Sequence, residues 1–434
     1  MRAWTAQQVA DAARAELQGP GAAGAGPSRV TIDSRDIRPG DLFVGLPGAR
    51  VDGGTFAEKA LTDGAWGVLV GPGHDIRMTG RGVVLVSDEP LVALQTLATA
   101  WRRELGAKVI GITGSTGKTS TKDILAGMLA PHLRTVATSQ NLNTEIGLPL
   151  TILGAPAGTE ALVLEMAMRG PEQIAELTEI AEPDVGVIVN VGPVHLELLG
   201  SIEAIAAAKA ELLRDLPTGA TAVVPVDEPL LAPHRTRDDV TWVTFGPGGD
   251  VADLGAVELP FTSAHMRLNG LAALAAARAV GVEPEGPVDV ALSDMRGQRR
   301  VLAGEVTVIN DCYNANPMSM LAALDHLAED TPSEGARRVA VLGDMLELGP
   351  DERRYHAEIG AHARERKIDV LVAVGPRAAA MVPPFGGEAH PVPDAAAAAA
   401  LLPTLVRSGD HVLVKASRGV GLEVVADALD AAIS

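Results

Sequence analysis

The chain has 434 residues, a length that allows two or three domains. Of these residues 47% are apolar and 21% charged, a composition typical of soluble globular proteins. The formal net charge of −19 argues against a nucleic-acid-binding role, because phosphate backbones attract basic surfaces. A single cysteine, Cys312, cannot form an internal disulfide framework and fits a reducing cytosol. No stretch reaches the ~18 apolar residues of a membrane-spanning helix, and the charged N-terminus lacks the apolar core of a signal peptide. We therefore expect a cytoplasmic protein that does not insert into membranes.

Residues 1–105 are predicted to form a small α/β domain. A helix is expected near residues 5–17, followed by a Gly/Ala/Pro-rich linker over 19–28. Short apolar runs typical of strands follow, at residues 30–35, 41–46, 67–70 and 83–88. Asp33, Ser34 and Arg35 come at the end of the first run, and the tripeptide alone is best interpreted as a strand end with a turn.

A glycine-rich motif, VIGITGSTGKTS, occupies residues 109–120 and runs from an apolar strand through a turn into a helix. Such a turn can point backbone N–H groups at phosphates, and the helix presents its positive end to them. Lys118 would reach the β- and γ-phosphates, and the Thr119 hydroxyl would bind Mg²⁺. The common eight-residue loop has glycine where this chain has Ile112, so a glycine-rich turn with a solvated lysine is the alternative. The residues assigned to the nucleotide here are Gly114, Ser115, Thr116, Gly117, Lys118, Thr119 and Ser120.

Residues 106–297 are predicted to hold this loop in a parallel sheet. Two nearly continuous apolar runs, one ending at Glu165 and one leading toward His195, are typical of strands covered on both faces. Polar residues at the carboxyl ends of such strands line the ligand crevice of a doubly wound sheet. Glu165 and His195 could there complete a Mg²⁺ site. Taken alone, His195 is better interpreted as a loop histidine, because Mg²⁺ prefers oxygen ligands.

A helix is predicted over residues 201–213, with Ser201 as its N-cap and an apolar stripe at intervals of three and four residues. Lys209 occupies one position of that stripe. Burial disfavours an ammonium ion, so the pKa of Lys209 should fall and leave a neutral amine that can react with CO₂. The alternative is a lysine that packs its stem and keeps its charged end in water.

Residues 298–434 alternate strand and helix patterns, which predicts a second doubly wound sheet. Asp311 ends the strand at 306–311, where a carboxylate can accept hydrogen bonds from both ribose hydroxyls. The phrase YNANP at residues 313–317 follows it, and its composition alone is that of a strand-to-helix turn.

These motifs together resemble the Mur ligase family. The loop at 111–120 is similar to that of the Mur ligase and folylpolyglutamate synthetase superfamily, and residues 30–65 resemble the UDP-binding domain of the two late-acting Mur ligases. The YNANP phrase looks like that of the branch that adds D-alanyl-D-alanine, whereas the sibling that adds diaminopimelate or lysine usually has D-N-P-R there.

The resemblance implies roles for individual residues. Ser34 and Arg35 would lie at the uridine nucleotide, Glu165 would bind the first metal, His195 would help to place the second, and Lys209 would be carbamoylated and bind Mg²⁺. The nucleotide residues beyond the loop would be Asn269, Arg299 and Asp311, with Arg300 as the rival of Arg299. The implied catalytic residues are Lys118, Lys209 and His195, and the implied metal residues are Thr119, Glu165, His195 and Lys209. The implied substrate residues are Ser34, Arg35, Asn143, Thr144, Tyr313, Asn314 and Asn316.

The function implied is an ATP-dependent ligase with two Mg²⁺ ions that joins D-alanyl-D-alanine to UDP-N-acetylmuramoyl-tripeptide through an acyl phosphate. Residues 1–105 would bind the UDP-sugar-peptide, residues 106–297 would bind ATP, and residues 298–434 would form a Rossmann-like domain for the dipeptide and part of ATP. The protein is expected to be a monomer. The alternatives are a sibling ligase, a folylpolyglutamate synthetase, and a nucleotide-gated scaffold without chemistry.

Overall fold

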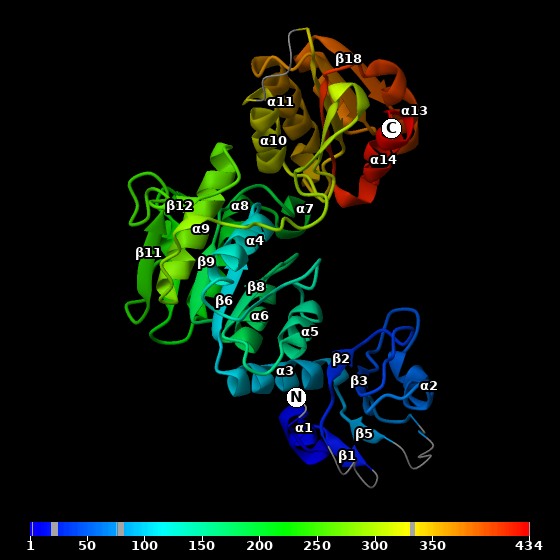
Figure 1. The fold of residues 1–434 in the computed structure, drawn as a ribbon, viewed down its shortest axis with the longest axis vertical. Helices are drawn as coiled ribbons and strands as arrows, with labels where there is room; N and C mark the ends of the chain where they lie inside the picture. Colours follow the sequence, from blue (N-terminus) through cyan, green and yellow to red (C-terminus); the bar gives the residue numbers. More distant parts are fainter. Residues whose placement is uncertain (2, 19–24, 75, 77–81, 330–334, 434) are drawn as a thin grey trace.

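The computed structural model describes residues 1, 3–18, 25–74, 76, 82–329 and 335–433. They form three α/β domains in a row along the longest axis, with the central domain between the other two (Figure 1). Part of the predicted linker, residues 19–24, lies outside this description. Among the described residues, no helix is both long and apolar enough to cross a membrane.

The N-terminal domain is built on a five-stranded sheet in the order β1-β5-β4-β3-β2. Its elements are α1 (Ala6–Ala13), β1 (Glu16–Gln18), β2 (Arg29–Thr31), β3 (Asp41–Val44), α2 (Ala57–Thr62), β4 (Gly67–Val70) and β5 (Val83–Val86). The helix expected to reach residue 17 ends at Ala13, so that prediction was wrong. Arg14 takes a left-handed conformation (φ 51°), and Glu16–Gln18 then pairs antiparallel with β5.

The central domain contains a six-stranded, all-parallel sheet in the order β11-β10-β9-β6-β8-β7. Its strands are β6 (Lys108–Thr113), β7 (Thr135–Ala137), β8 (Ala161–Glu165), β9 (Val185–Ile188), β10 (Thr221–Pro225) and β11 (Thr241–Phe245), with a small ribbon of β12 (Val257–Glu258) and β13 (Gly286–Pro287) beside it. Its helices are α3 (Pro90–Leu105), α4 (Lys118–Leu129), α5 (Gly147–Gly154), α6 (Gln173–Ala181), α7 (Leu196–Leu199), α8 (Ile202–Arg214) and α9 (Ala264–Ala279). Helices α4 and α9 cover one face, and α3, α5, α6 and α8 cover the other. The strands are therefore buried on both sides, as their apolar sequences predict.

Helix α3 joins the first two domains, because it packs against α1 on one side and against α5 and α6 on the other (Figure 1). Trp101 of α3 meets Trp4 edge to face at 5.4 Å between ring centroids, and its indole N–H donates to the Ala155 carbonyl at 3.0 Å. One continuous apolar core thus runs from the N-terminal domain into the central domain.

The C-terminal domain has a six-stranded sheet in the order β14-β15-β19-β16-β17-β18, parallel except for β14. Its strands are β14 (Gln298–Val301), β15 (Thr307–Asn310), β16 (Arg338–Gly343), β17 (Val370–Val374), β18 (Glu388–Val392) and β19 (His411–Lys415). Its helices are α10 (Pro317–Glu329), α11 (Glu352–Glu365), α12 (Val382–Phe385), α13 (Ala395–Leu405) and α14 (Glu423–Ile433). Helices α10 and α11 cover one face and α13 and α14 the other, which confirms a second α/β sheet.

Burial in this domain raises the pKa of the Cys312 thiol to about 12, so the thiol stays protonated at neutral pH.

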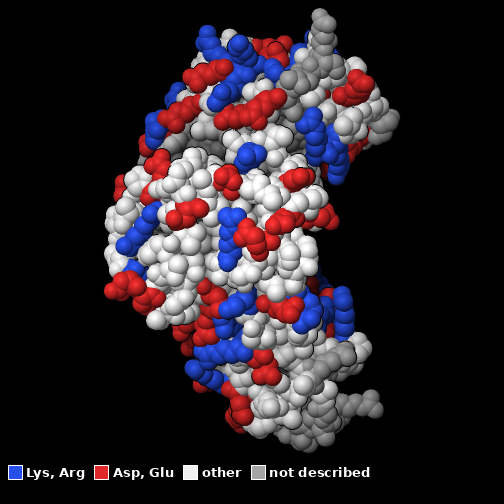
Figure 2. Space-filling model, turned by 60° about the vertical axis from the view of Figure 1, so that its left-hand side comes forward, with Lys and Arg blue, Asp and Glu red and all other residues white. Residues whose placement is uncertain are grey.

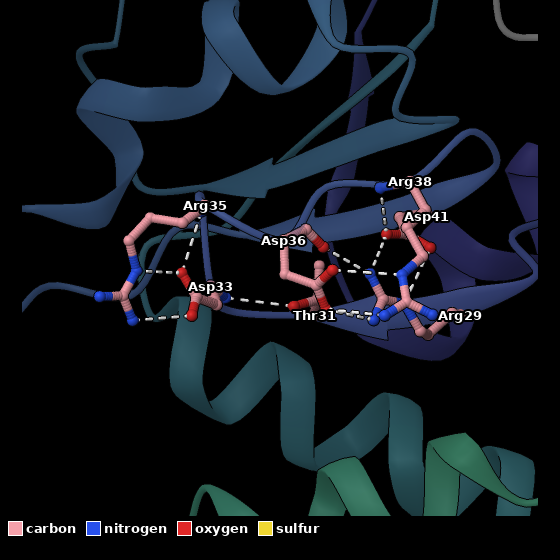
Figure 3. A network of polar contacts seen from close by, with 7 residues as sticks. All are labelled: Arg29, Thr31, Asp33, Arg35, Asp36, Arg38 and Asp41. Atoms are coloured by element: carbon pink, nitrogen blue, oxygen red, sulfur yellow. Dashed lines mark hydrogen bonds and ion pairs between the residues drawn. The ribbon is translucent and has the colours of Figure 1, made fainter.

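Charged side chains of both signs are interspersed on the face of the molecule that Figure 2 presents. In the N-terminal domain, charged side chains form a network around Arg29 at the start of β2 (Figure 3). Its guanidinium lies 2.8 Å from the Asp36 carboxylate and 2.5 Å from that of Asp41, which is 1% exposed.

We expect Arg29→Ala to lower the free energy of unfolding by about 1–3 kcal/mol, because it leaves the buried Asp41 carboxylate without its cation. Urea unfolding measures this difference. Arg35→Ala is the matched control: the Arg35 side chain is 88% exposed, so its loss should change stability by less than about 0.5 kcal/mol. Equal effects of the two substitutions would contradict the assignment of Arg29 as a structural residue.

Candidate active site

A cavity of about 1660 Å³ lies between the central and C-terminal domains. The carboxyl ends of β8 and β9 open onto it, as expected for the ligand crevice of a parallel sheet. The predicted residues that line it are Ser115, Thr116, Gly117, Lys118, Thr119, Ser120, Asn143, Thr144, Glu165, His195, Asn269, Arg299, Asp311, Tyr313, Asn314 and Asn316. Gly114, Lys209, Ser34 and Arg35 are not part of this lining. The structure thus brings residues from two domains and many separate segments to one cavity.

The glycine-rich loop joins β6 to α4 and ends at Gly117, which has a φ of +78°. The left-handed conformation favours glycine, and a Cβ atom on Gly117 would lie 2.5 Å from Asn269 Oδ1 and displace that side chain. Asn269 therefore packs directly against the loop from α9. Lys118 Nζ donates to the Gly114 carbonyl at 2.8 Å, and burial lowers the Lys118 pKa.

Glu165, at the end of β8, is 2% exposed and is held by two side chains. Thr119 Oγ1 donates to Glu165 Oε2 at 2.7 Å, and Asn143 Nδ2 donates to Glu165 Oε1 at 2.8 Å. The hydroxyl and the carboxylate are hard oxygen donors of the kind that Mg²⁺ prefers. The first turn of α4 thus offers a suitable place for such an ion.

Lys209 lies on α8, where the Ser201 hydroxyl caps the helix by accepting the Ala204 N–H at 3.1 Å. The lysine is 2% exposed, which confirms its predicted burial and does not fit a side chain with its end in water. Burial first, and the charge of Lys118 second, place the Lys209 pKa well below its usual value. Among the described residues, no carboxylate forms an ion pair with Lys209.

Lys209→Met should alter the pH dependence of stability in CO₂-free buffer. The Lys209 pKa is lower in the folded state, so the unfolded chain binds more protons and wild-type stability rises with pH between the two pKa values. The methionine variant should lose this rise and be the more stable protein near neutral pH. Urea unfolding between about pH 7 and 10 measures the slopes. Lys108→Met, at a side chain that is 56% exposed, serves as the control, and a Lys209→Met slope equal to that of wild type would contradict the shifted pKa.

His195 meets Glu347 across the two domains. Its Nδ1 forms a hydrogen bond with the Glu347 carboxylate, and the Glu197 N–H donates to the Glu347 carbonyl at 3.3 Å. His195 (φ 54°) and Glu347 (φ 62°) both have left-handed backbone conformations, which are unfavourable for such residues. Burial lowers the His195 pKa, and the neighbouring Glu347 opposes that effect. The contact exists only when the two domains are together.

The segment after β15 supplies further polar groups. Lys415 is 2% exposed, and its Nζ lies 2.6 Å from the Asp311 carboxylate and 2.9 Å from the Asn314 carbonyl. The Asn316 side chain caps α10 by accepting the Ser319 N–H at 2.9 Å. A buried lysine at the carboxyl end of β19, an interior strand of the sheet, thus fixes the carboxylate of Asp311 beside the cavity.

Arg296 is a site residue that the sequence analysis missed. Its guanidinium lies 4.0 Å from the centre of the Tyr313 ring, and its charge helps to lower the Lys118 pKa. Arg299 also lines the cavity, whereas Arg300 forms an ion pair with Asp430 of α14 at 2.6 Å and is not part of the lining. The one available signal for Arg296 was its place three residues before Arg299.

Ser34, Arg35 and Asp344 lie outside the lining of this cavity. Ser34 and Arg35 belong to the N-terminal domain, where Arg35 pairs with Asp33 at 2.8 Å (Figure 3). Asp344 accepts the N–H groups of Arg377 and Ala378 at 3.0 and 2.7 Å, so it caps the helical turn after β17 instead of facing the cavity.

Comparison with known proteins identifies the family. Three family models match the chain: "Mur ligase family, catalytic domain" at residues 28–93, "Mur ligase middle domain" at 112–277, and "Mur ligase, glutamate ligase domain" at 295–418. The UDP-N-acetylmuramoyl-tripeptide–D-alanyl-D-alanine ligase of Synechocystis sp. is 37% identical over 426 residues, which cover 93% of this chain and 92% of the relative. The crystal structure of MurF from Acinetobacter baumannii matches with a TM-score of 0.87 and 28% identity, covering 98% of this chain and 99% of that one. The MurF ligase of Thermotoga maritima, solved in complex with ADP, matches with a TM-score of 0.79 and 31% identity over 93% and 97% of the two chains. This chain belongs to the Mur ligase family.

Proposed function

We propose that this protein is the ATP-dependent ligase that joins D-alanyl-D-alanine to UDP-N-acetylmuramoyl-tripeptide in peptidoglycan synthesis. The observation that carries the proposal is one cavity faced by the phosphate loop from the central domain and by residues 313–316 from the C-terminal domain. The relative from Synechocystis sp., which covers 93% of this chain, is named as a ligase of this kind, and the MurF ligase of Thermotoga maritima was solved with ADP.

Amide formation requires that the tripeptide carboxylate be activated, because a carboxylate oxygen is a poor leaving group. The carboxylate attacks the γ-phosphate of ATP and forms an acyl phosphate with release of ADP. Lys118 and the N–H groups of the first turn of α4 stabilise the negative charge that develops on the transferred phosphoryl group. The dipeptide amine then attacks the acyl carbon, and the tetrahedral intermediate collapses with release of inorganic phosphate.

Thr119 and Glu165 would hold a Mg²⁺ ion, since their adjacent oxygens form a hard donor pair at the phosphate loop. The ion would supply charge neutralisation at the phosphates. Lys209 would contribute a carbamate, because its amine is buried and its lowered pKa leaves it unprotonated for reaction with CO₂. His195 would complete the second metal site.

We assign the remaining binding roles to three domains, with proposed boundaries at about residues 105 and 297. Asn269 would contact the nucleotide, and the Asp311 carboxylate would accept hydrogen bonds from the ribose hydroxyls. Arg296 or Arg299 would reach the phosphates. Ser34 and Arg35 would bind the uridine nucleotide in residues 1–105, with Asn143, Thr144, Tyr313, Asn314 and Asn316 toward the peptide substrates. Contact between the two domains, as at His195 and Glu347, would shield the acyl phosphate from water.

Phosphate release from ATP and Mg²⁺ tests the proposal, measured with UDP-N-acetylmuramoyl-tripeptide in the presence and absence of D-alanyl-D-alanine, with product masses. Release that requires the dipeptide and yields a UDP-linked pentapeptide is expected. Release that requires a single amino acid would indicate a sibling ligase, and release that requires folate and glutamate would indicate a folylpolyglutamate synthetase. Absence of release with every acceptor would favour a scaffold.

A further inference from the structure

Asn190 lies two residues beyond the end of β9, and both its amide oxygen and its amide nitrogen form hydrogen bonds with the phosphate loop. Its Oδ1 accepts the N–H groups of Ser115 and Thr116 at 3.1 and 3.0 Å, and its Nδ2 donates to the Thr116 carbonyl at 3.0 Å. The Asn190 carbonyl also accepts the Ser115 N–H, at 3.2 Å. One asparagine thus satisfies three backbone groups of two successive loop residues.

Gly192, two positions after Asn190, forms hydrogen bonds with the same part of the loop. Ser115 Oγ donates to the Gly192 carbonyl at 3.0 Å and lies 2.8 Å from the Gly192 nitrogen. The C-terminal domain contacts both sides of this pair, because Asn316 Nδ2 donates to the Ser115 carbonyl at 3.4 Å and Met318 fills the space that a Cβ on Gly192 would occupy. Residues 190–192 therefore lie between the phosphate loop and the second domain.

These bonds divide the loop N–H groups into two sets. Those of Ser115 and Thr116 are directed to Asn190, so they are not available to a phosphate. Those at the first turn of α4, which begins at Lys118, have no side-chain cap among the described residues. Phosphate oxygens would thus be bound from Gly117 onward, and the loop residues before it would set the position of that turn.

We propose that Asn190 is a positioning residue that holds the phosphate loop in its binding conformation before the nucleotide arrives. The inference rests on the proposed nucleotide function. Its physical basis is preorganisation: a loop fixed by three side-chain hydrogen bonds loses little conformational freedom when a triphosphate binds. The adenosine end of the nucleotide makes no use of these bonds, so Asn190 should matter for the phosphates and not for the base.

The test is calorimetric titration of wild type and Asn190→Ala with ATP and with adenosine, together with the melting temperature of each protein. We expect the ATP Kd to rise about tenfold or more in Asn190→Ala, while the adenosine Kd changes less than about twofold. Gln7→Ala removes an exposed amide side chain on α1, outside this cavity. It is the control and should keep the wild-type ratio of the two affinities. If Asn190→Ala does not fold, Asn190→Ser, which leaves a hydroxyl that is too short to make all three bonds, gives the same comparison.

The outcomes separate the two proposals. An unchanged ATP Kd in the variant, or equal losses for ATP and adenosine, would overturn the positioning role while the nucleotide function stands. A wild-type protein that binds adenosine and ATP equally well, with no contribution from the phosphates, would overturn the proposed function and this inference with it.

Discussion

Lys209→Ala is expected to reduce kcat by about 10²–10³-fold, the range seen when one electrostatic group of an active site is removed. The proposed carbamate would be lost with the amine. Lys209 lies close enough to His195 to lower the His195 pKa by its charge, and the charge of Lys118 in turn lowers the Lys209 pKa. The measurement is the rate of phosphate release with both peptide substrates at saturation. The substitution removes a buried lysine without a carboxylate partner among the described residues, so the loss should not come from unfolding.

Short carboxylates such as acetate distinguish a lost anion from a general disturbance of α8. They can enter the space left by Lys209→Ala and restore part of the negative charge, so partial recovery of activity is expected. Near-normal turnover of Lys209→Ala without any additive would rule out the carbamate. Lys108→Ala, at the exposed start of β6, should show neither the loss nor the rescue.

Lys118→Met is expected to cost a similar factor of about 10²–10³ in kcat, because methionine keeps most of the side-chain length and removes the charge that faces the phosphates. The lysine lies in the first turn of α4 and lines the cavity, where its burial strengthens its electrostatic effect. The measurement is single-turnover formation of ADP, which reports the phosphoryl transfer step itself.

The matched control for Lys118→Met is Lys108→Met, which changes the same type of side chain at the start of β6, the end of the strand away from the loop. Wild-type rates in Lys108→Met and a large loss in Lys118→Met are the predicted pair of results. Equal single-turnover rates in the two variants would show that Lys118 does not act on the transferred phosphoryl group.

Much of the fold could be predicted from local sequence patterns. The continuous apolar runs of β6, β8 and β9 predicted buried parallel strands, since this pattern needs no knowledge of the partner strand. The pairing of Glu16–Gln18 with β5 could not be predicted, because the residues that pair with it lie about seventy positions away and the preceding segment has a helical pattern. Strands β14 and β18 could not be predicted for a different reason: their short sequences have little apolar character.

The same distinction between local sequence patterns and contacts with distant segments applies to the candidate site. The place of Glu165 at the cavity and the burial of Lys209 could be predicted, because each residue stands at a defined position of its own strand or helix. Arg296, Asn190 and the contact of His195 with Glu347 could not, because each depends on a residue that another element brings close.

The central claim is that the tripeptide carboxylate is phosphorylated before the amide forms. The most direct measurement uses tripeptide substrate with both oxygens of the reacting carboxylate labelled with ¹⁸O, in unlabelled water. If the carboxylate attacks ATP, the bridging oxygen leaves with the phosphoryl group, and mass spectrometry should find one ¹⁸O in each inorganic phosphate and the other in the new amide. Phosphate without ¹⁸O, formed at the same rate as the amide product, would contradict the proposed mechanism.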